Sequence, residues 1–163
     1  MLKLFTPVKI GTLELKNRLV RSATWDATAD NQGAVTDQSV AIFRELGRGG
    51  IGLIITGHAF VSALGQATPA QYGIHRDEMI PGLRRLTDAV HREGSKVGVQ
   101  ITHCGINSGY LRSQRVPVQV VSPRKDTEML QEEMTDTEIE SVIADFALAA
   151  RRAVDAGFDA VQL

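Results

Sequence analysis

Strand-like and helix-like segments alternate along this chain, and this alternation restricts its fold more than any other feature of the sequence. Four short apolar runs are typical of strands in a buried sheet, at residues 19–23, 51–55, 96–101 and 158–163. Three segments between them repeat their apolar residues at helical spacing, at residues 37–46, 81–93 and 136–156. This order predicts a parallel sheet whose strands are joined by right-handed helical crossovers.

The connections between these segments have two very different lengths. Long loops follow the second and third strands, at residues 57–80 and 102–134, whereas the returns from helix to strand are short and contain glycine. In a (β/α)8 barrel, the loops that follow the strands carry the chemistry. The asymmetry therefore favours part of such a barrel over a small doubly wound sheet, the alternative. No GxGxxG motif follows the first strand, which weakens a dinucleotide-binding interpretation.

Capping signals indicate where the three helices begin and end. Thr36 and Pro81 suit the starts of the first two, and Thr135 begins the third in a capping box with Glu138. Three glycines are expected to end them: Gly47, Gly94 and Gly157. The stripes expected to face the sheet are Val40, Phe43 and Leu46, then Leu83, Leu86 and Val90, then Ile139, Val142, Ile143, Phe146, Ala150 and Val154.

A hairpin is expected ahead of the first strand. Residues 6–16 alternate apolar and polar side chains around Gly11-Thr12, and one face would be buried, formed by Val8, Ile10, Leu13 and Leu15. The predicted fold class is therefore α/β, with an N-terminal β-hairpin, four parallel strands and three helices.

Charge and cysteine content exclude several function classes. The chain has 18 Lys and Arg against 19 Asp and Glu, so its net charge of -1 gives no basis for binding nucleic acid or anionic lipid. No apolar run approaches the ~20 residues that cross a bilayer, and the start lacks the features of a signal peptide. The single cysteine, Cys104, cannot form an internal disulfide, so a cytoplasmic location is expected.

Four predicted strand ends should converge at one edge of the sheet. They are residues 22–25, 56–58, 100–103 and Leu163, and they offer a carboxamide and two imidazoles but no carboxylate. A glutamine side chain both donates and accepts hydrogen bonds, so it can recognise a ring that carries N–H and C=O groups on one edge. The strand ends therefore suit a neutral, planar ligand better than hydrolysis, and no metal site is expected.

Several motifs, in order, resemble the Old Yellow Enzyme family. They are residues 4–11, 15–18, 52–57 and 98–105, and the likeness extends over essentially the whole chain. The family consists of FMN-dependent NAD(P)H oxidoreductases on a (β/α)8 TIM barrel. The resemblance implies that residues 1–163 are the N-terminal half of such a barrel, a partial FMN-binding domain truncated at strand four. It implies FMN as cofactor, NAD(P)H as reductant, and hydride transfer to a small-molecule electrophile such as an activated alkene.

The resemblance also implies which residues contact the flavin. The first strand tip would lie along the isoalloxazine, the second would pass close to it, and a glutamine would bind its pyrimidine edge. These cofactor-binding residues are Ser22, Ala23, Thr24, Trp25, Gly57, His58 and Gln100. The chain departs from the family at Trp25, where other members carry a thiol or hydroxyl side chain that tunes the flavin, and at Ile106, where an arginine is common.

No catalytic residue can be assigned by this resemblance. In the family, a His-x-x-His or His-x-x-Asn pair followed by Gly-Tyr comes directly after strand four, whereas this sequence reaches Leu163 at that point. Gly109-Tyr110-Leu111 has similar letters, but it follows the third strand without a histidine pair, and we interpret it as a coincidence. The fragment is therefore expected to be inactive by itself.

Two alternatives remain open at this stage. The chain can be a non-catalytic half-barrel that is stable only by self-association, or by pairing with a complementary half, through its two exposed sheet edges. A complete flavodoxin-like domain is less favoured, because the segment after the first strand lacks glycine. Two structural expectations accompany these hypotheses: Arg21 should form a buried ion pair, and Cys104 should be an inert thiol.

Overall fold

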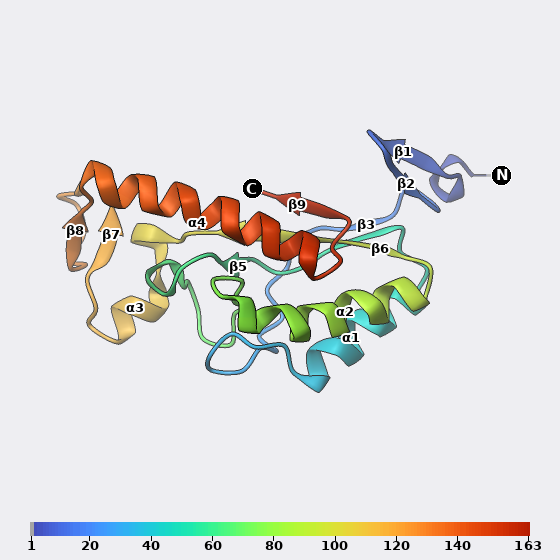
Figure 1. Cartoon of the computed structure of the whole chain (residues 1–163), viewed down its shortest axis with the longest axis horizontal. Helices are drawn as coiled ribbons and strands as arrows, with labels where there is room; N and C mark the ends of the chain where they lie inside the picture. Colours follow the sequence, from blue (N-terminus) through green and yellow to red (C-terminus); the bar gives the residue numbers. More distant parts are fainter. Residues whose placement is uncertain (1) are drawn as a thin grey trace.

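The computed structural model describes residues 2–163 and consists of short strands and four α-helices (Figure 1). The strands are β1 (Val8–Ile10), β2 (Leu13–Leu15), β3 (Val20–Arg21), β4 (Leu53–Ile55), β5 (Ala59–Phe60), β6 (Lys96–Thr102), β7 (Val118–Val120), β8 (Gln131–Glu133) and β9 (Ala160–Gln162). The helices are α1 (Asp37–Arg48), α2 (Ile80–Arg92), α3 (Gly109–Ser113) and α4 (Asp136–Asp155).

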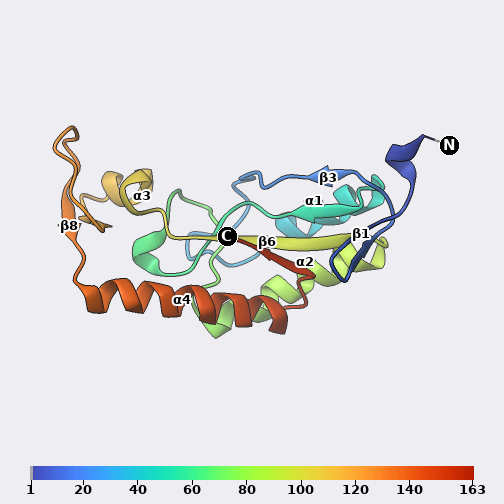
Figure 2. The same ribbon diagram turned by 90° about the horizontal axis from the view of Figure 1, so that it is seen from above.

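The central sheet has the strand order of a barrel opened along one side. Strands β3, β4, β6 and β9 are neighbours in that order, and every pair is parallel. Helices α2 and α4 pack against β6 and against each other, and α1 packs on α2 (Figures 1 and 2). The predicted α/β class with four parallel strands and three crossover helices is confirmed.

The β6–α4 connection contains structure that the sequence did not predict. It includes the short helix α3 and the strands β7 and β8, which pair in parallel at the end of the molecule farthest from the hairpin (Figure 1). Leu111, Val118 and Val120 form a small separate apolar cluster there, and Tyr110 packs against it. Tyr110 is therefore a packing residue in this structure. The loop after β4 likewise contains a strand, β5, which pairs with the end of β6.

Both threonine caps are confirmed, but the predicted end of α1 is wrong. Thr36 and Thr135 each accept a hydrogen bond from a backbone N–H within a capping box. Helix α1 continues through Gly47 to Arg48, and Gly50 adopts the left-handed conformation instead. Gly47 is buried against Glu93, whose Cβ would lie 3.0 Å from a Cβ at this position. The glycine is thus needed for close packing, not for ending the helix.

The core lies between the helices and the sheet, with one error in the predicted helix faces. Phe43, Leu83, Leu86 and Val90 are fully buried as expected. On α4, however, the residues buried against the sheet are alanines: Ala149 and Ala153, followed by Ala156. Ile143 and Val154, which were expected to face the sheet, are 65% and 68% exposed. Small side chains let the helix lie close to β6, and this rotation turns the larger apolar residues outward.

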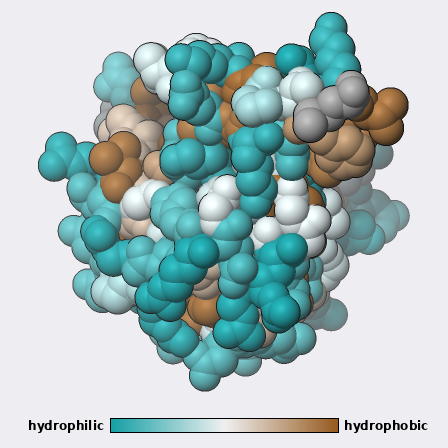
Figure 3. Space-filling model, turned by 90° about the vertical axis from the view of Figure 1, so that its right-hand side faces the viewer, coloured by the Kyte–Doolittle hydropathy of each residue, from teal (hydrophilic) through white to brown (hydrophobic). Residues whose placement is uncertain are grey.

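The hairpin forms as predicted, but only part of its apolar face is buried. Val8 pairs with Leu15 and Ile10 with Leu13, so all four share one face. Leu15 is buried, whereas Ile10, next to the turn, is 55% exposed. Figure 3 views the molecule from this end and shows a mainly hydrophilic face with apolar side chains gathered near one corner.

Asp159 joins the start of β9 to two other elements. Its carboxylate accepts hydrogen bonds from Lys96 Nζ at 2.7 Å and from the Val97 backbone N–H at 2.9 Å, and lies 2.7 Å from His91 Nε2 on α2. Burial alone would raise the pKa of Asp159, but these hydrogen bonds outweigh it and hold the pKa below its ordinary value. The Asp159 side chain is therefore charged, and in this form it holds the fourth strand of the sheet in place.

This arrangement predicts acid sensitivity. A carboxyl group whose pKa is lower in the folded chain stabilises the fold fully above its unfolded pKa of about 4, and the contribution is lost as the pH falls through the folded pKa. Urea unfolding of the wild type and Asp159→Asn should show a variant that is less stable by about 1–3 kcal/mol at pH 7. The difference should shrink between about pH 5 and pH 3. A difference that does not change with pH would contradict the assignment.

Within residues 2–163, no helix combines the length and apolar character that a bilayer crossing requires.

Candidate functional site

The predicted site residues follow, or lie within, three neighbouring parallel strands, β3, β4 and β6. Residues 22–25 follow β3, Gly57 and His58 follow β4, and Gln100 lies in the second half of β6. Trp25 is 46% exposed and Ser22 and Thr24 are also exposed, so the first tip is accessible to a ligand. The first two predicted tips do converge, because Gly57 lies against the Thr24–Trp25 backbone, but the His103 imidazole, also expected at this rim, lies on the helix side of the sheet.

The first two tips are in direct backbone contact. A Cβ at Gly57 would lie 2.8 Å from the Thr24 carbonyl oxygen and 3.0 Å from Trp25 Cα. Any larger residue at this position would push the two tips apart, because the opposing atoms belong to the backbone. Gly57 thus allows the two chain segments to lie in direct contact.

Arg21 also links the same two tips through its hydrogen bonds. Its guanidinium donates to the Ile55 carbonyl at 3.1 Å and to the Thr24 carbonyl at 3.4 Å, and lies 5.5 Å from the centroid of the Phe43 ring. The expected ion pair is absent from the described residues, so that prediction is wrong. Backbone carbonyls and an aromatic face satisfy the cation instead.

Gln100 contacts a residue that the sequence analysis did not select. Its Nε2 donates to Gln162 Oε1 on β9 at 3.3 Å. The two positions are directly opposite in the parallel register, so both carboxamides face the same side of the sheet. Among residues 2–163, no hydrogen bond joins Gln100 to the Ser22–Trp25 segment. The structure places these two groups on one rim without linking them.

His58 presents an unsatisfied polar atom at this rim. Its Nδ1 is buried and has no hydrogen-bond partner among the described residues. A buried polar group without a partner costs free energy. The carbonyl of the neighbouring Gly57 already accepts a hydrogen bond from the Thr56 hydroxyl at 2.8 Å.

A carboxylate lies directly behind the first tip, although none was expected among the strand ends. Asp26 Oδ1 accepts hydrogen bonds from the Thr28 hydroxyl at 2.7 Å and the Tyr72 hydroxyl at 3.0 Å, and Ser39 joins the same network. Burial raises the pKa of Tyr72 to about 12, so its hydroxyl remains a donor at neutral pH. Because Asp26 and Tyr72 are far apart in sequence, no local signal revealed this network.

The remaining candidates play a smaller part at the rim. Burial raises the pKa of the Cys104 thiol, which agrees with the expected inert thiol. Burial also lowers the pKa of His103, and its imidazole lies on the helix side of the sheet. Among residues 2–163, no group of three or more His, Cys, Asp or Glu side chains is arranged to hold a metal ion.

Comparison with known proteins now identifies the family. Residues 3–163 match the family model described as the NADH:flavin oxidoreductase / NADH oxidase family. The chain belongs to this family. Its members use FMN and a nicotinamide reductant, so the resemblance and the cofactors that it implies for the family are confirmed.

The relatives of this chain within the family are considerably longer. It is 39% identical to a metal reductase of Desulforamulus reducens, covering 98% of this chain and 24% of the relative. It is 34% identical to an NADPH dehydrogenase of Listeria monocytogenes, covering 100% and 48%. The Old Yellow Enzyme of a Pichia species superposes with a TM-score of 0.89 at 26% identity, covering 98% of this chain and 45% of that one. The chain thus spans about half or less of these proteins, and its fold matches part of the Old Yellow Enzyme TIM barrel.

Proposed function

We propose that this chain supplies the ring-binding strand tips of an FMN-dependent oxidoreductase that takes hydride from NAD(P)H and delivers it to an activated alkene or a similar small electrophile. In this proposal, residues 1–163 form a partial FMN-binding barrel domain that works in the cytoplasm. The observation that carries it is the shared rim: Gly57, after β4, packs on the Thr24–Trp25 backbone, and Gln100 lies on β6, the strand next to β4.

The chemistry of the rim fits a flavin ring. The closely packed backbone of the first two tips leaves room for the face of a ring beside it, and the Gln100 carboxamide suits the pyrimidine edge, which carries N–H and C=O groups. When bound, FMN would supply the hydride-carrying centre. The side chains of this chain would bind and orient the ring, and no catalytic role is proposed for any of them.

Flavin titration of the purified 163-residue chain tests this proposal. We expect nearly colourless material without NADPH oxidation, which binds added flavin weakly. Because only ring contacts are proposed, FMN and riboflavin should bind with affinities within about twofold of each other. Gln100→Ala should weaken both by about fivefold to tenfold. Quenching of flavin fluorescence measures these affinities.

The control is Gln38→Ala, which removes an exposed carboxamide from α1 and should leave flavin affinity unchanged. Stoichiometric yellow material with NADPH turnover, or binding unaffected by Gln100→Ala, would overturn the proposal.

Self-association is a second candidate role, favoured by the open sheet. Among the described residues, β3 and β9 each pair with one neighbour only, and Val161 on β9 is 38% exposed. Two copies joined edge to edge would contribute eight strands. Light scattering should then give about twice the 17.7 kDa mass of one chain, and Val161→Lys should restore the monomer. A wild-type monomer that unfolds cooperatively would rule this role out.

A further inference from the structure

A turn in the left-handed conformation comes directly after the first strand tip. Ala27 has a φ of 55°, which is unfavourable for a residue with a Cβ and persists only where its surroundings fix it. The preceding side chain spans this turn, because Asp26 Oδ1 accepts a hydrogen bond from the Thr28 backbone N–H at 3.2 Å. The conformation of the segment behind Trp25 therefore depends on one carboxylate.

Tyr72 holds this carboxylate from a distant part of the chain. Its hydroxyl donates to the same Asp26 Oδ1 at 3.0 Å and lies 2.7 Å from the Thr28 hydroxyl. Tyr72 is itself firmly placed: it is 3% exposed, its ring packs edge-on against Phe43, and its carbonyl oxygen accepts a hydrogen bond from the Phe60 backbone N–H at 2.9 Å. A donor that the core keeps in place thus holds the turn through Asp26.

Helix α1 anchors the other end of the turn. The Thr28 carbonyl oxygen accepts hydrogen bonds from the Thr36 hydroxyl at 2.7 Å and the Ser39 hydroxyl at 2.9 Å. These two residues form the capping box of the helix. The turn is therefore attached to the start of α1 as well as to Tyr72.

Trp25 is held mainly through its backbone. Its side chain is 46% exposed, so burial alone does not fix its orientation. On one side the first tip packs on Gly57, where an added Cβ would lie 3.0 Å from Trp25 Cα, and on the other side the turn begins at Asp26. A change in the turn would therefore move an exposed aromatic side chain at the rim.

We propose that Asp26 and Tyr72 are positioning residues for the first strand tip: their hydrogen bond holds the turn at Ala27, and the turn holds Trp25 in one orientation. The consequence for the cofactor rests on the proposed function, in which this tip faces a flavin ring. A tip that is held before the ring arrives loses less conformational freedom on binding. Neither residue takes part in the chemistry.

Trp25 is the only tryptophan of the chain, so its fluorescence reports on the tip directly. In the flavin-free chain, Tyr72→Phe keeps the buried ring but removes the hydroxyl, and it should raise the rate constant for acrylamide quenching about twofold and lower the emission anisotropy. Asp26→Ala should have at least this effect. Asp26→Asn keeps the acceptor oxygen and should stay close to the wild type.

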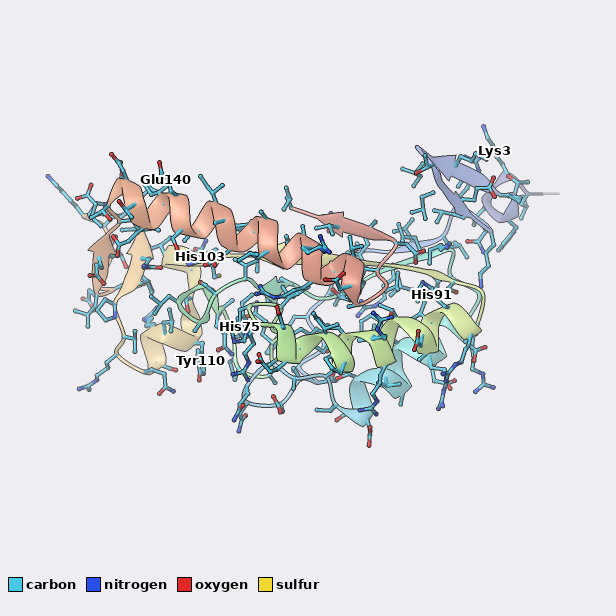
Figure 4. The ribbon with its side chains drawn as sticks, viewed as in Figure 1. Lys3, His75, His91, His103, Tyr110 and Glu140 are labelled. Carbon is cyan, nitrogen blue, oxygen red and sulfur yellow. The ribbon has the colours of Figure 1, made fainter. Side chains whose placement is uncertain are left out.

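Tyr110→Phe is the matched control. Tyr110 lies on α3 and packs in the separate apolar cluster beside β7, and its hydroxyl makes no hydrogen bond within residues 2–163 (Figure 4). The substitution removes the same atom and should leave Trp25 quenching unchanged. Unchanged quenching in Tyr72→Phe, or equal effects of Asp26→Asn and Asp26→Ala, would overturn the inference. If Asp26→Ala does not fold, as judged by circular dichroism, Tyr72→Phe decides the question alone.

Riboflavin titration separates this inference from the proposed function. Tyr72→Phe should weaken riboflavin binding about threefold to fivefold, whereas Tyr110→Phe should not change it. A more mobile Trp25 with unchanged riboflavin affinity would overturn the consequence for the cofactor. A wild-type chain that binds no flavin would contradict the proposed function, and the fluorescence of the flavin-free variants would still decide whether Asp26 and Tyr72 position the tip.

Discussion

Phe43→Ala is expected to lower the free energy of unfolding by about 3–5 kcal/mol. The Phe43 side chain is fully buried on α1 and packs edge-on against Tyr72, with ring centroids 6.3 Å apart. The Arg21 guanidinium lies over its other side. Truncation removes the buried apolar area, leaves a cavity in the core and deprives Arg21 of its aromatic partner.

The loss should also reach the candidate site, because Arg21 bonds the carbonyls of Ile55 and Thr24 at the strand tips. Urea unfolding followed by circular dichroism measures the stability. Phe5→Ala is the matched control, since Phe5 is exposed and its removal should cost no more than about 0.5 kcal/mol. A loss below about 1 kcal/mol for Phe43→Ala would show that this aromatic cluster does not support the fold.

Gly57→Ala is expected to destabilise the chain by about 2–3 kcal/mol and to weaken flavin binding at least tenfold. The added methyl group would lie 2.8 Å from the Thr24 carbonyl oxygen and 3.0 Å from Trp25 Cα. Neither backbone atom can move without shifting the whole first tip. The contact between the two tips that are proposed to bind the ring is therefore disrupted together with the packing.

Gly109→Ala provides the control for the glycine substitution itself. A Cβ at Gly109 would have its nearest contact at 3.8 Å, from the Ala67 carbonyl oxygen, which is an ordinary van der Waals distance. Denaturant unfolding and flavin titration of both variants should separate them clearly. Similar small effects in the two would mean that the tips are not held as closely as the structure shows.

Local patterns were sufficient to predict most of the elements. The threonine caps, the apolar stripe of α2 and the parallel strand order follow from residues that lie close together in sequence. The face of α4 was predicted wrongly because helical spacing marked Ile143 and Val154, while the sheet required the smaller Ala149 and Ala153. The fit between a helix and a sheet depends on tertiary packing, which the helical periodicity of the sequence does not reveal.

The candidate site was predictable only in part, because some of its contacts also depend on tertiary structure. The motifs placed the seven selected residues on strand tips, and the parallel topology brought those tips to one rim. The partners that complete the rim come from distant segments: Tyr72 for Asp26, Gln162 for Gln100 and the Ile55 carbonyl for Arg21. Because each pairing depends on the assembled fold, no spacing rule could have identified it.

The Asp159 contacts bear on how barrels of this kind can be recombined. The β/α units of such a fold look like modules that could be exchanged between relatives at any boundary. Here one carboxylate at the fourth strand takes hydrogen bonds from the start of β6 and contacts His91 at the end of α2. A chimaera with a junction between α2 and β9 would take Asp159 from one parent and His91, or both His91 and Lys96, from the other. Productive exchange therefore requires that Asp159, Lys96 and His91 be inherited together.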